Sequence, residues 1–205
     1  MKTYSLHEGE LLVKAARNAI EIFVGSAEFR REAVEKGIEE LDQKHGVFVT
    51  IYHYPTRTLR GCIGFTEATE PVKRMIVDAA IAAATEDPRF VPVSHLEFDH
   101  ITIEVSVLSK AERMAGSPDE IKDQIKIGRD GLVIDYGYHR GLLLPAVPVE
   151  EGWGAEEFLD NLCTKAGLKQ HVWKQRGVAL SRFSTQVFAE AEPRGRVREL
   201  RLEEL

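Results

Sequence analysis

The chain has 205 residues and a formal net charge of -6, with 29% charged residues. This balance excludes a protein that simply coats nucleic-acid phosphates, unless its basic residues gather on one face. No apolar run approaches the roughly 20 residues of a membrane-spanning helix, and the N-terminus is typical of an amphipathic helix rather than a secretion signal. Two cysteines in very different contexts suit a reducing compartment, so we expect a cytoplasmic protein without a membrane partner.

The first half of the chain opens with a helix whose start is marked by a capping box. Glu8 follows Ser5 at the required spacing, and apolar side chains then recur at helical intervals as far as Val24. This pattern predicts a helix with one face against the core. A second, more charged helix is predicted over about 27–43, closed by Gly46.

A hairpin and a third helix come next. The segment "VFVTIYH" at 47–53 carries β-branched and aromatic residues on both faces, which is typical of an interior strand. The turn "YPTRT" returns the chain into "LRGCIGF" at 59–65, which predicts a β-hairpin. A helix predicted over 71–86 has Pro71 in its first turn and stops before Pro88.

The second half begins with a strand at 100–109, "HITIEVSVLS", whose alternation predicts one apolar and one polar face. A capping box at Ser117 predicts a short helix, and the segments "LVIDY" and "LLLP" predict another hairpin. A last long helix around 158–166 and a strand over 178–187 follow. We expect the basic and acidic segment 193–205 to be a solvated or frayed tail.

These elements predict an α+β fold with mainly antiparallel β-sheets flanked by α-helices, because the strands pair as hairpins without strict βαβ alternation. No repeat, low-complexity tract or linker separates independent domains. We therefore expect a single domain over residues 1–205, with a core from about 5 to 190 and the charged tail at 193–205.

The two cysteines are predicted to lie in different environments. Cys163 falls on the apolar stripe of the last long helix, where a free cysteine behaves as a small hydrophobic residue. Cys62 lies between Gly61 and Gly64 on a strand, and alternation puts it on the same face as Arg60. An adjacent guanidinium favours the thiolate, so Cys62 is a candidate nucleophile or redox thiol and Arg60 a candidate ligand-binding residue.

The glycines beside the thiol allow two interpretations. A glycine inside a strand marks a bulge, a tight crossing or a ligand that lies against bare backbone. The last case makes Gly61 and Gly64 ligand contacts, whereas the others make them architectural and leave Cys62 as a small filler. His53, across the hairpin, and His139, in the second turn, are candidate partner bases, although either could be an ordinary surface histidine.

Motifs for the common cofactors are absent. There is no P-loop, no dinucleotide glycine fingerprint, no HExxH and no CxxC, so we predict no metal and no cofactor. His95, Asp99 and His100 offer ligand atoms, but their spacing fits no standard metal site and is explained by a loop that enters a strand.

Six segments, in this order along the chain, together resemble the AMMECR domain family in its microbial form. They are "LRGCIGF", "AIAAATEDPRF", "ITIEVSVLS", "IGRDGLVI", "RGLLLP" and "GWGAEEFLDNLCTKAGL". The resemblance covers roughly residues 5–190, which is nearly the whole chain.

The resemblance implies one α+β domain of two unequal lobes, with the RGCIG segment near the cleft between them. It assigns no biochemical activity, so whether the protein is an enzyme stays open. Similar microbial proteins are associated with Memo-type proteins and radical-SAM enzymes, which are therefore candidate partners. The family pattern usually continues with a glutamine after "LLLP", where this chain has Ala146, so any ligand contact made by that amide is missing here.

The recognised segments extend the candidate site. Asp87 and Arg89 follow a helix end, Glu104 lies on the polar face of a strand, and Arg140 lies in a turn. Gathered around the RGCIG segment, these ligand-binding candidates would suit an anionic or zwitterionic small molecule, or a peptide. Alternatively, the three residues Asp87, Arg89 and Glu104 form an internal ion-pair network.

Three functional hypotheses follow. The first is a cleft around the RGCIG segment that binds a small polar or anionic ligand or a peptide, and in its enzymatic version Cys62 supplies thiol chemistry. The alternative is a non-catalytic interaction module for a Memo-type or radical-SAM partner, which the lack of an evident base favours. Nucleic-acid binding is the third; the net charge disfavours it and only the segment 193–205 supports it.

Overall fold

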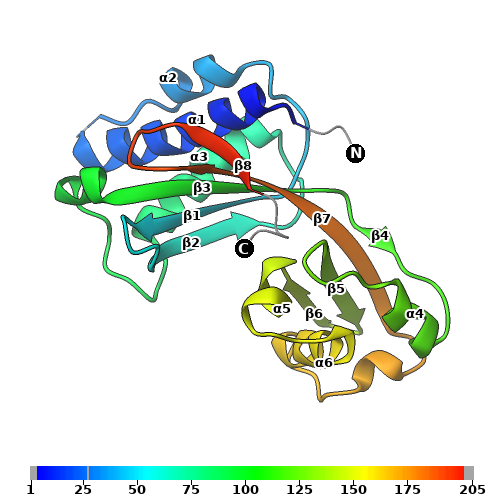
Figure 1. Ribbon diagram of the computed structural model, residues 1–205. Helices are drawn as coiled ribbons and strands as arrows, with labels where there is room; N and C mark the ends of the chain where they lie inside the picture. Colours follow the sequence, from blue (N-terminus) through cyan, green and yellow to red (C-terminus); the bar gives the residue numbers. More distant parts are fainter. Residues whose placement is uncertain (1–3, 27, 201–205) are drawn as a thin grey trace. The chain divides into compact units, whose positions relative to one another are not determined.

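The computed structural model describes residues 4–26 and 28–200 and divides the chain into two compact units (Figure 1). The first unit takes the described residues up to Leu108 together with Gln186–Leu200. The second unit takes Ser109–Thr185. Each unit has a hydrophobic core of its own, so each is described separately.

Two long helices of the first unit begin and end where the sequence predicts. In α1 (Leu6–Gly25) the N–H of Glu8 donates to Oγ of Ser5 over 3.3 Å, and the N–H of Ser5 donates to Oε2 of Glu8 over 2.8 Å. This capping box satisfies donors that a helix N-terminus would otherwise leave unpaired. The helix α3 (Val72–Thr85) ends before Pro88, as expected.

The second helix is much shorter than the predicted span of 27–43. It consists of α2 (Arg31–Glu35) and a 3₁₀ turn, η1 (Lys36–Ile38). No side chain caps its N-terminus at Arg30, and it buries few apolar side chains. Charged residues with good helix propensity do not extend a helix that has so little packing to stabilise it. Ala27 lies outside the described residues.

The sheet of the first unit is centred on β1 (Val47–His53). This strand pairs antiparallel with β2 (Leu59–Phe65), confirming the predicted hairpin, and with β3 (Ile101–Leu108), which follows the 3₁₀ helix η2 (His95–His100). β3 lies next to β7 (Ala179–Glu190), which also pairs with β8 (Val197–Leu200). β8 lies within the segment expected to be a frayed tail, so that expectation is wrong up to Leu200; residues 201–205 lie outside the described residues.

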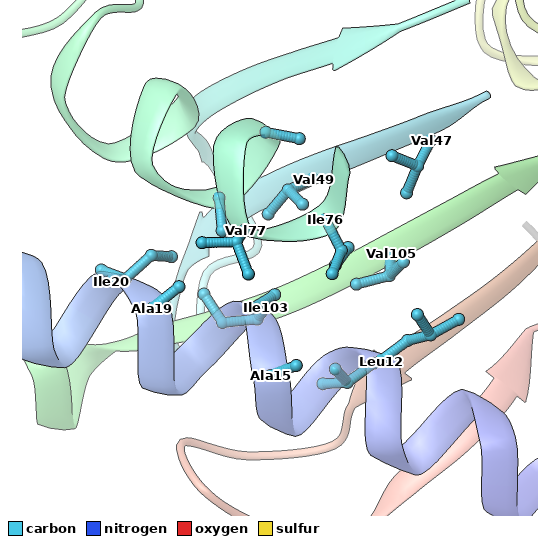
Figure 2. Packing of buried hydrophobic residues seen from close by; sticks show 14 of the residues in the cluster. Leu12, Ala15, Ala19, Ile20, Val47, Val49, Ile76, Val77, Ile103 and Val105 are labelled. Carbon is cyan, nitrogen blue, oxygen red and sulfur yellow. The ribbon is translucent and has the colours of Figure 1, made fainter. Parts of the chain in front are cut away.

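The core of the first unit lies between its two long helices and the sheet. Figure 2 shows side chains of α1 and α3 pointing toward those of β1 and β3. Burying one such aliphatic side chain contributes about 1.5–3 kcal/mol. The residues labelled there are Leu12, Ala15, Ala19, Ile20, Val47, Val49, Ile76, Val77, Ile103 and Val105.

Strand β3 has the predicted apolar and polar faces, but both of them are buried. Its polar side chains Thr102, Glu104 and Ser106 are as inaccessible as many core residues. Alternation indicates which residues share a face of a strand, whereas it does not indicate what covers that face. A buried polar face is costly unless its groups are hydrogen-bonded, which makes it a place to look for a site.

The first unit also buries an ion pair. Arg17 of α1 donates from Nε to Oε1 of Glu190 over 2.6 Å and from Nη2 to Oε2 over 2.5 Å. Backbone groups complete the arrangement, because Nη2 also donates to the carbonyl of Ile101 and the N–H of Ile103 donates to Oε2 of Glu190. The pair thus joins α1 to β3 and to the end of β7 with its hydrogen-bonding groups occupied.

The second unit has the predicted hairpin at its centre. β5 pairs antiparallel with β6 and with residues 179–184 of β7, and the short β4 pairs with β7. Its elements are β4 (Glu112–Arg113), α4 (Pro118–Gln124), β5 (Asp130–Tyr136), β6 (His139–Leu143), α5 (Ala146–Glu150), α6 (Ala155–Lys165) and η3 (Val172–Lys174). The predicted capping box at Ser117 is present.

The last long helix packs as the apolar stripe predicts. Cys163 of α6 is fully buried in the core of the second unit, next to a carboxylate, Asp160, that accepts a hydrogen bond from Nε1 of Trp173 over 2.8 Å. Antiparallel sheets flanked by helices make this an α+β protein, which confirms the predicted fold class. In the described part of the chain, no helix has both the length and the apolar character needed to cross a membrane.

Candidate functional site

The RGCIG segment lies on β2, and a bulge interrupts its pairing with β1. Ile51 pairs with Gly61, whereas the next residue of β1, Tyr52, pairs with Leu59, so that Arg60 has no partner on β1. An extra residue of this kind breaks the alternation of side chains. The sequence argument that placed Arg60 beside Cys62 on one face assumed an unbroken strand.

Arg60 is directed toward Glu97 of η2. Its Nε donates to Oε2 over 2.7 Å and its Nη2 to Oε1 over 3.2 Å, and its side chain is only 6% exposed. The guanidinium also lies 5.9 Å from the ring centre of Phe90. The role of Arg60 in ligand binding stays a prediction, but its guanidinium is already occupied by a carboxylate within the unit.

The two glycines lie where protein atoms leave no room for a side chain. A Cβ atom on Gly61 would come within 2.2 Å of the carbonyl oxygen of Ala83 in α3. A Cβ atom on Gly64 would come within 2.3 Å of the ring of Phe48 and 2.4 Å of the carbonyl oxygen of Val47. Close packing inside the unit therefore explains both glycines, and their contact with a ligand stays a prediction.

Cys62 begins a row of polar side chains across three strands. Thr50 of β1 pairs with Cys62 on one side and with Glu104 of β3 on the other. Paired residues of neighbouring strands direct their side chains to the same face. A hydrogen bond of 3.2 Å joins Sγ of Cys62 to Oγ1 of Thr50. Thr50 and Glu104 are buried and Cys62 is partly buried, so the row is largely shielded from water.

Asp87 holds both the thiol segment and Arg89. Its Oδ2 accepts a hydrogen bond of 2.9 Å from the backbone N–H of Cys62. Arg89 donates to both carboxylate oxygens, from Nε over 2.9 Å and from Nη2 over 2.7 Å. These hydrogen bonds from Arg89 hold the pKa of Asp87 well below its ordinary value. The side chain of Asp87 is 3% exposed and that of Arg89 is 54% exposed, so a buried carboxylate anchors a largely exposed cation.

The pKa of the Cys62 thiol is raised from its ordinary value, and burial is the main cause. The hydrogen bond between Thr50 and Cys62 and the positive charge of Arg89 act in the opposite direction, and the negative charges of Glu104 and Asp87 raise the pKa further. The sequence argument that Arg60 would favour the thiolate is thus wrong: the nearby cation is Arg89, and burial outweighs it.

Glu104 holds a second exposed guanidinium. Nη2 of Arg57 lies 3.3 Å from Oε2 of Glu104, with side chains 43% and 11% exposed. The guanidinium also lies 4.8 Å from the ring centre of Tyr52, within cation–π range. Arg57 adopts a left-handed conformation, with φ of 54°, in the turn between β1 and β2. The sequence analysis missed this residue because "YPTRT" indicates only a turn and does not show which strand lies beneath it.

The remaining candidates belong to other elements of the chain. Arg140 belongs to β6 of the second unit, where its Nε lies 3.6 Å from Oδ1 of Asp135, and its place in a site with Cys62 stays a prediction. Nδ1 of His139 lies 3.0 Å from the carbonyl oxygen of Ala166. Asp99, considered above as a metal ligand, forms an ion pair with Arg194. Over residues 4–26 and 28–200, no three or more His, Cys, Asp or Glu side chains gather closely enough to hold a metal ion.

The fold and the site define an α+β protein in which the partly buried Cys62 shares a polar sheet face with one buried carboxylate, Glu104, and donates its backbone N–H to a second, Asp87. The family model for AMMECR1 matches residues 13–188, and the chain belongs to this family. Protein MJ0810 of Methanocaldococcus jannaschii is 46% identical to the chain over 203 residues, covering 98% of this chain and 100% of that protein. Protein TK0174 of Thermococcus kodakarensis is 46% identical over 193 residues, covering 93% and 94%.

A solved structure agrees with the fold. The crystal structure of uncharacterized protein PH0010 from Pyrococcus horikoshii matches with a TM-score of 0.86 and 42% sequence identity, over 95% of this chain and 97% of that chain. The identity and the coverage confirm the resemblance drawn from the six sequence segments.

Proposed function

We propose that the protein binds a small anionic ligand, either free or as part of a peptide, on the polar face of β1, β2 and β3 beside Cys62. The observation that carries this proposal is the pairing of buried carboxylates with exposed arginines around the thiol. Asp87 forms an ion pair with Arg89, and Glu104 forms an ion pair with Arg57. Guanidinium groups bind carboxylates and phosphates with paired hydrogen bonds, and these groups are already held in place.

The thiol has a specific place in this proposal. Because its pKa is raised, Cys62 is protonated in the resting protein at neutral pH and contacts the ligand as a neutral S–H group. In an enzymatic version of the proposal the thiol would have to lose its proton after the ligand is bound. A free thiol also suits the reducing conditions of the cytoplasm, where we place this function.

Protection of Cys62 against alkylation tests the proposal. The folded protein is treated with iodoacetamide, with and without phosphates, carboxylates or short acidic peptides, and labelling of each cysteine is followed by mass spectrometry. Cys163 is the internal control because it is fully buried in the second unit. We expect at least one anion to slow the labelling of Cys62 and leave that of Cys163 unchanged. If no anion changes the rate at Cys62, the proposal is wrong.

A Cys62→Ser variant then separates binding from chemistry. If the ligand still binds to the variant with similar affinity but is no longer converted, the enzymatic version holds. If ligand binding and every activity are unchanged, Cys62 is a structural neighbour of the site and the enzymatic version fails.

A protein partner is the second candidate function, favoured by two exposed apolar side chains beside the site. Val91 is 77% exposed and Leu96 is 74% exposed, in the segment that runs from Asp87 to Glu97. The two residues are five positions apart in the chain, and they would form a docking surface if they share one contiguous exposed patch. The resemblance suggests a Memo-type or radical-SAM protein as the partner.

Substitution of both apolar residues tests the second candidate. We expect purified protein to bind a purified Memo-type or radical-SAM partner, and Val91→Asp/Leu96→Asp to abolish that complex. The matched control is Tyr138→Asp, at an exposed aromatic residue of the second unit. A complex that survives the double substitution, or that is equally weakened by the control, would show that this segment is not the docking surface.

A further inference from the structure

Two pairs of arginines in the first unit differ in their own exposure. Arg17 and Arg60 are themselves buried, with both side chains 6% exposed, and they bind Glu190 and Glu97, which are 4% and 27% exposed. Arg57 and Arg89 bind buried carboxylates, but their own side chains are 43% and 54% exposed. Burial of the carboxylate and exposure of the cation leave a positive group facing outward at a fixed position.

The hydrogen bonds leave donors of both guanidinium groups available. Asp87 occupies Nε and Nη2 of Arg89, and Glu104 is approached by Nη2 of Arg57. Nη1 of Arg89 and both Nη1 and Nε of Arg57 have no hydrogen-bond partner among residues 4–26 and 28–200. A guanidinium that is anchored on one side and unoccupied on the other loses little conformational freedom when it binds an anion.

The two anchors lie on different sides of the same thiol. Asp87 binds the backbone N–H of Cys62, which points away from β1. Glu104 lies in the opposite direction, beyond Thr50 on β3. The carboxylates that hold the two exposed arginines therefore lie on opposite sides of Cys62.

We propose that Arg57 and Arg89 together bind a small acid with two separate anionic groups, one at each guanidinium, so that the middle of the ligand lies over Cys62. This inference rests on the proposed function. It narrows the ligand class from any anion to an acid with two separate anionic groups. It adds Arg57, which had no place in the candidate site drawn from the sequence. Two charge-assisted contacts at fixed positions select for ligand length as well as for charge.

The test compares acids with one and two anionic groups on the full-length protein. Succinate and 2-phosphoglycolate carry two anionic groups and acetate carries one. Dissociation constants are measured from the backbone amide NMR shifts of Gly61 and Gly64. We expect at least one of the two dianions to bind about tenfold or more tightly than acetate, because a second charge-assisted contact adds to the first.

Single substitutions identify the two contacts. Arg57→Gln and Arg89→Gln should each weaken binding of that dianion about tenfold, to the level of acetate. Arg57→Lys and Arg89→Lys keep the charge but lose the planar guanidinium that donates two parallel hydrogen bonds. We therefore expect an intermediate loss of affinity. Arg74→Gln is the matched control, because Arg74 is 56% exposed in the same unit but pairs with an exposed carboxylate, Glu70. Thermal unfolding confirms that each variant is folded.

The outcomes distinguish this inference from the proposal on which it rests. If both dianions bind no more tightly than acetate, or if either Gln variant binds like the wild type, the two-point inference is overturned. Protection of Cys62 by acetate alone would still support an anion site in that case. If no acid shifts the amides and none protects Cys62, both proposals fail together. If Arg74→Gln weakens binding of the dianion as much as the other Gln variants do, general surface charge explains the affinity, and the inference is also overturned.

Discussion

Replacing Gly61 by alanine tests whether the glycine beside the thiol is there for packing. The added Cβ would lie 2.2 Å from the carbonyl oxygen of Ala83, a backbone atom that cannot rotate away. Strand β2 and helix α3 would have to separate by about 1 Å to restore an ordinary contact distance. Overpacking of this kind in a close-packed interior costs about 1–3 kcal/mol, and contact with backbone places this case at the upper end.

The expected result for Gly61→Ala is a loss of about 2–3 kcal/mol in the free energy of unfolding. For a chain of this length that loss corresponds to a fall in Tm of about 5–10 °C. Urea unfolding followed by far-UV circular dichroism gives the free energy, and calorimetry gives the Tm.

Gly37→Ala is the matched control in the same unit. No atom lies within 4 Å of a Cβ built there, and its backbone is not in the left-handed region. We expect the control to be neutral or to stabilise the protein by up to about 1 kcal/mol, because alanine restricts the unfolded chain. If Gly61→Ala is as stable as the control, the close crossing of β2 and α3 does not explain this glycine.

Three further predictions concern ionisable groups of the first unit. Arg17→Met should destabilise the protein by about 3–5 kcal/mol in urea unfolding, because it leaves Glu190 charged and buried, whereas Arg17→Met/Glu190→Met should recover much of that loss. A double variant no better than the single one would contradict this account. Asp87→Asn should lower the free energy of unfolding at pH 7. It should also make that free energy fall less steeply as the pH is lowered. The pKa of Asp87 is lowered on folding, so the stabilisation that its charge provides is complete above the ordinary value of 3.8 and is lost as pH falls through the lower folded-state pKa. Parallel curves of unfolding free energy against pH for variant and wild type below pH 4 would refute this prediction. Alkylation of Cys62 should reach half of its maximal rate above pH 9.0, and Thr50→Val should shift that midpoint still higher by removing the hydrogen bond that lowers the thiol pKa. A midpoint near neutral pH would show that the thiol is not controlled by burial.

The sequence was most informative where structure depends on local pattern. The capping boxes at Ser5 and Ser117, the stop before Pro88 and the burial of Cys163 all follow from residues within one or two turns. Helical periodicity and turn residues act over such short distances. The α+β class and both hairpins were therefore predictable.

The site was less predictable because it depends on how strands pair. The bulge at Arg60 arises from the register of β1 against β2, and it redirects the guanidinium to Glu97. The contact of Arg57 with Glu104 depends on β3 lying beside β1. Residues such as Asp87, Arg89 and Glu104 were identified from the sequence, but their partners could be assigned only in the folded chain.

The chain order of the first unit has a consequence for folding during synthesis. Glu190, the partner of buried Arg17, follows it by 173 residues, and the whole second unit is made in between. At about 5–20 residues per second, Arg17 waits about 10–35 s for that carboxylate. A nascent chain that ends before β7 thus has α1 and the first three strands, but Arg17 has only Glu21 of its own helix and not yet Glu190. Strands β7 and β8 therefore complete, after the second unit has been made, the sheet of the unit that α1 begins.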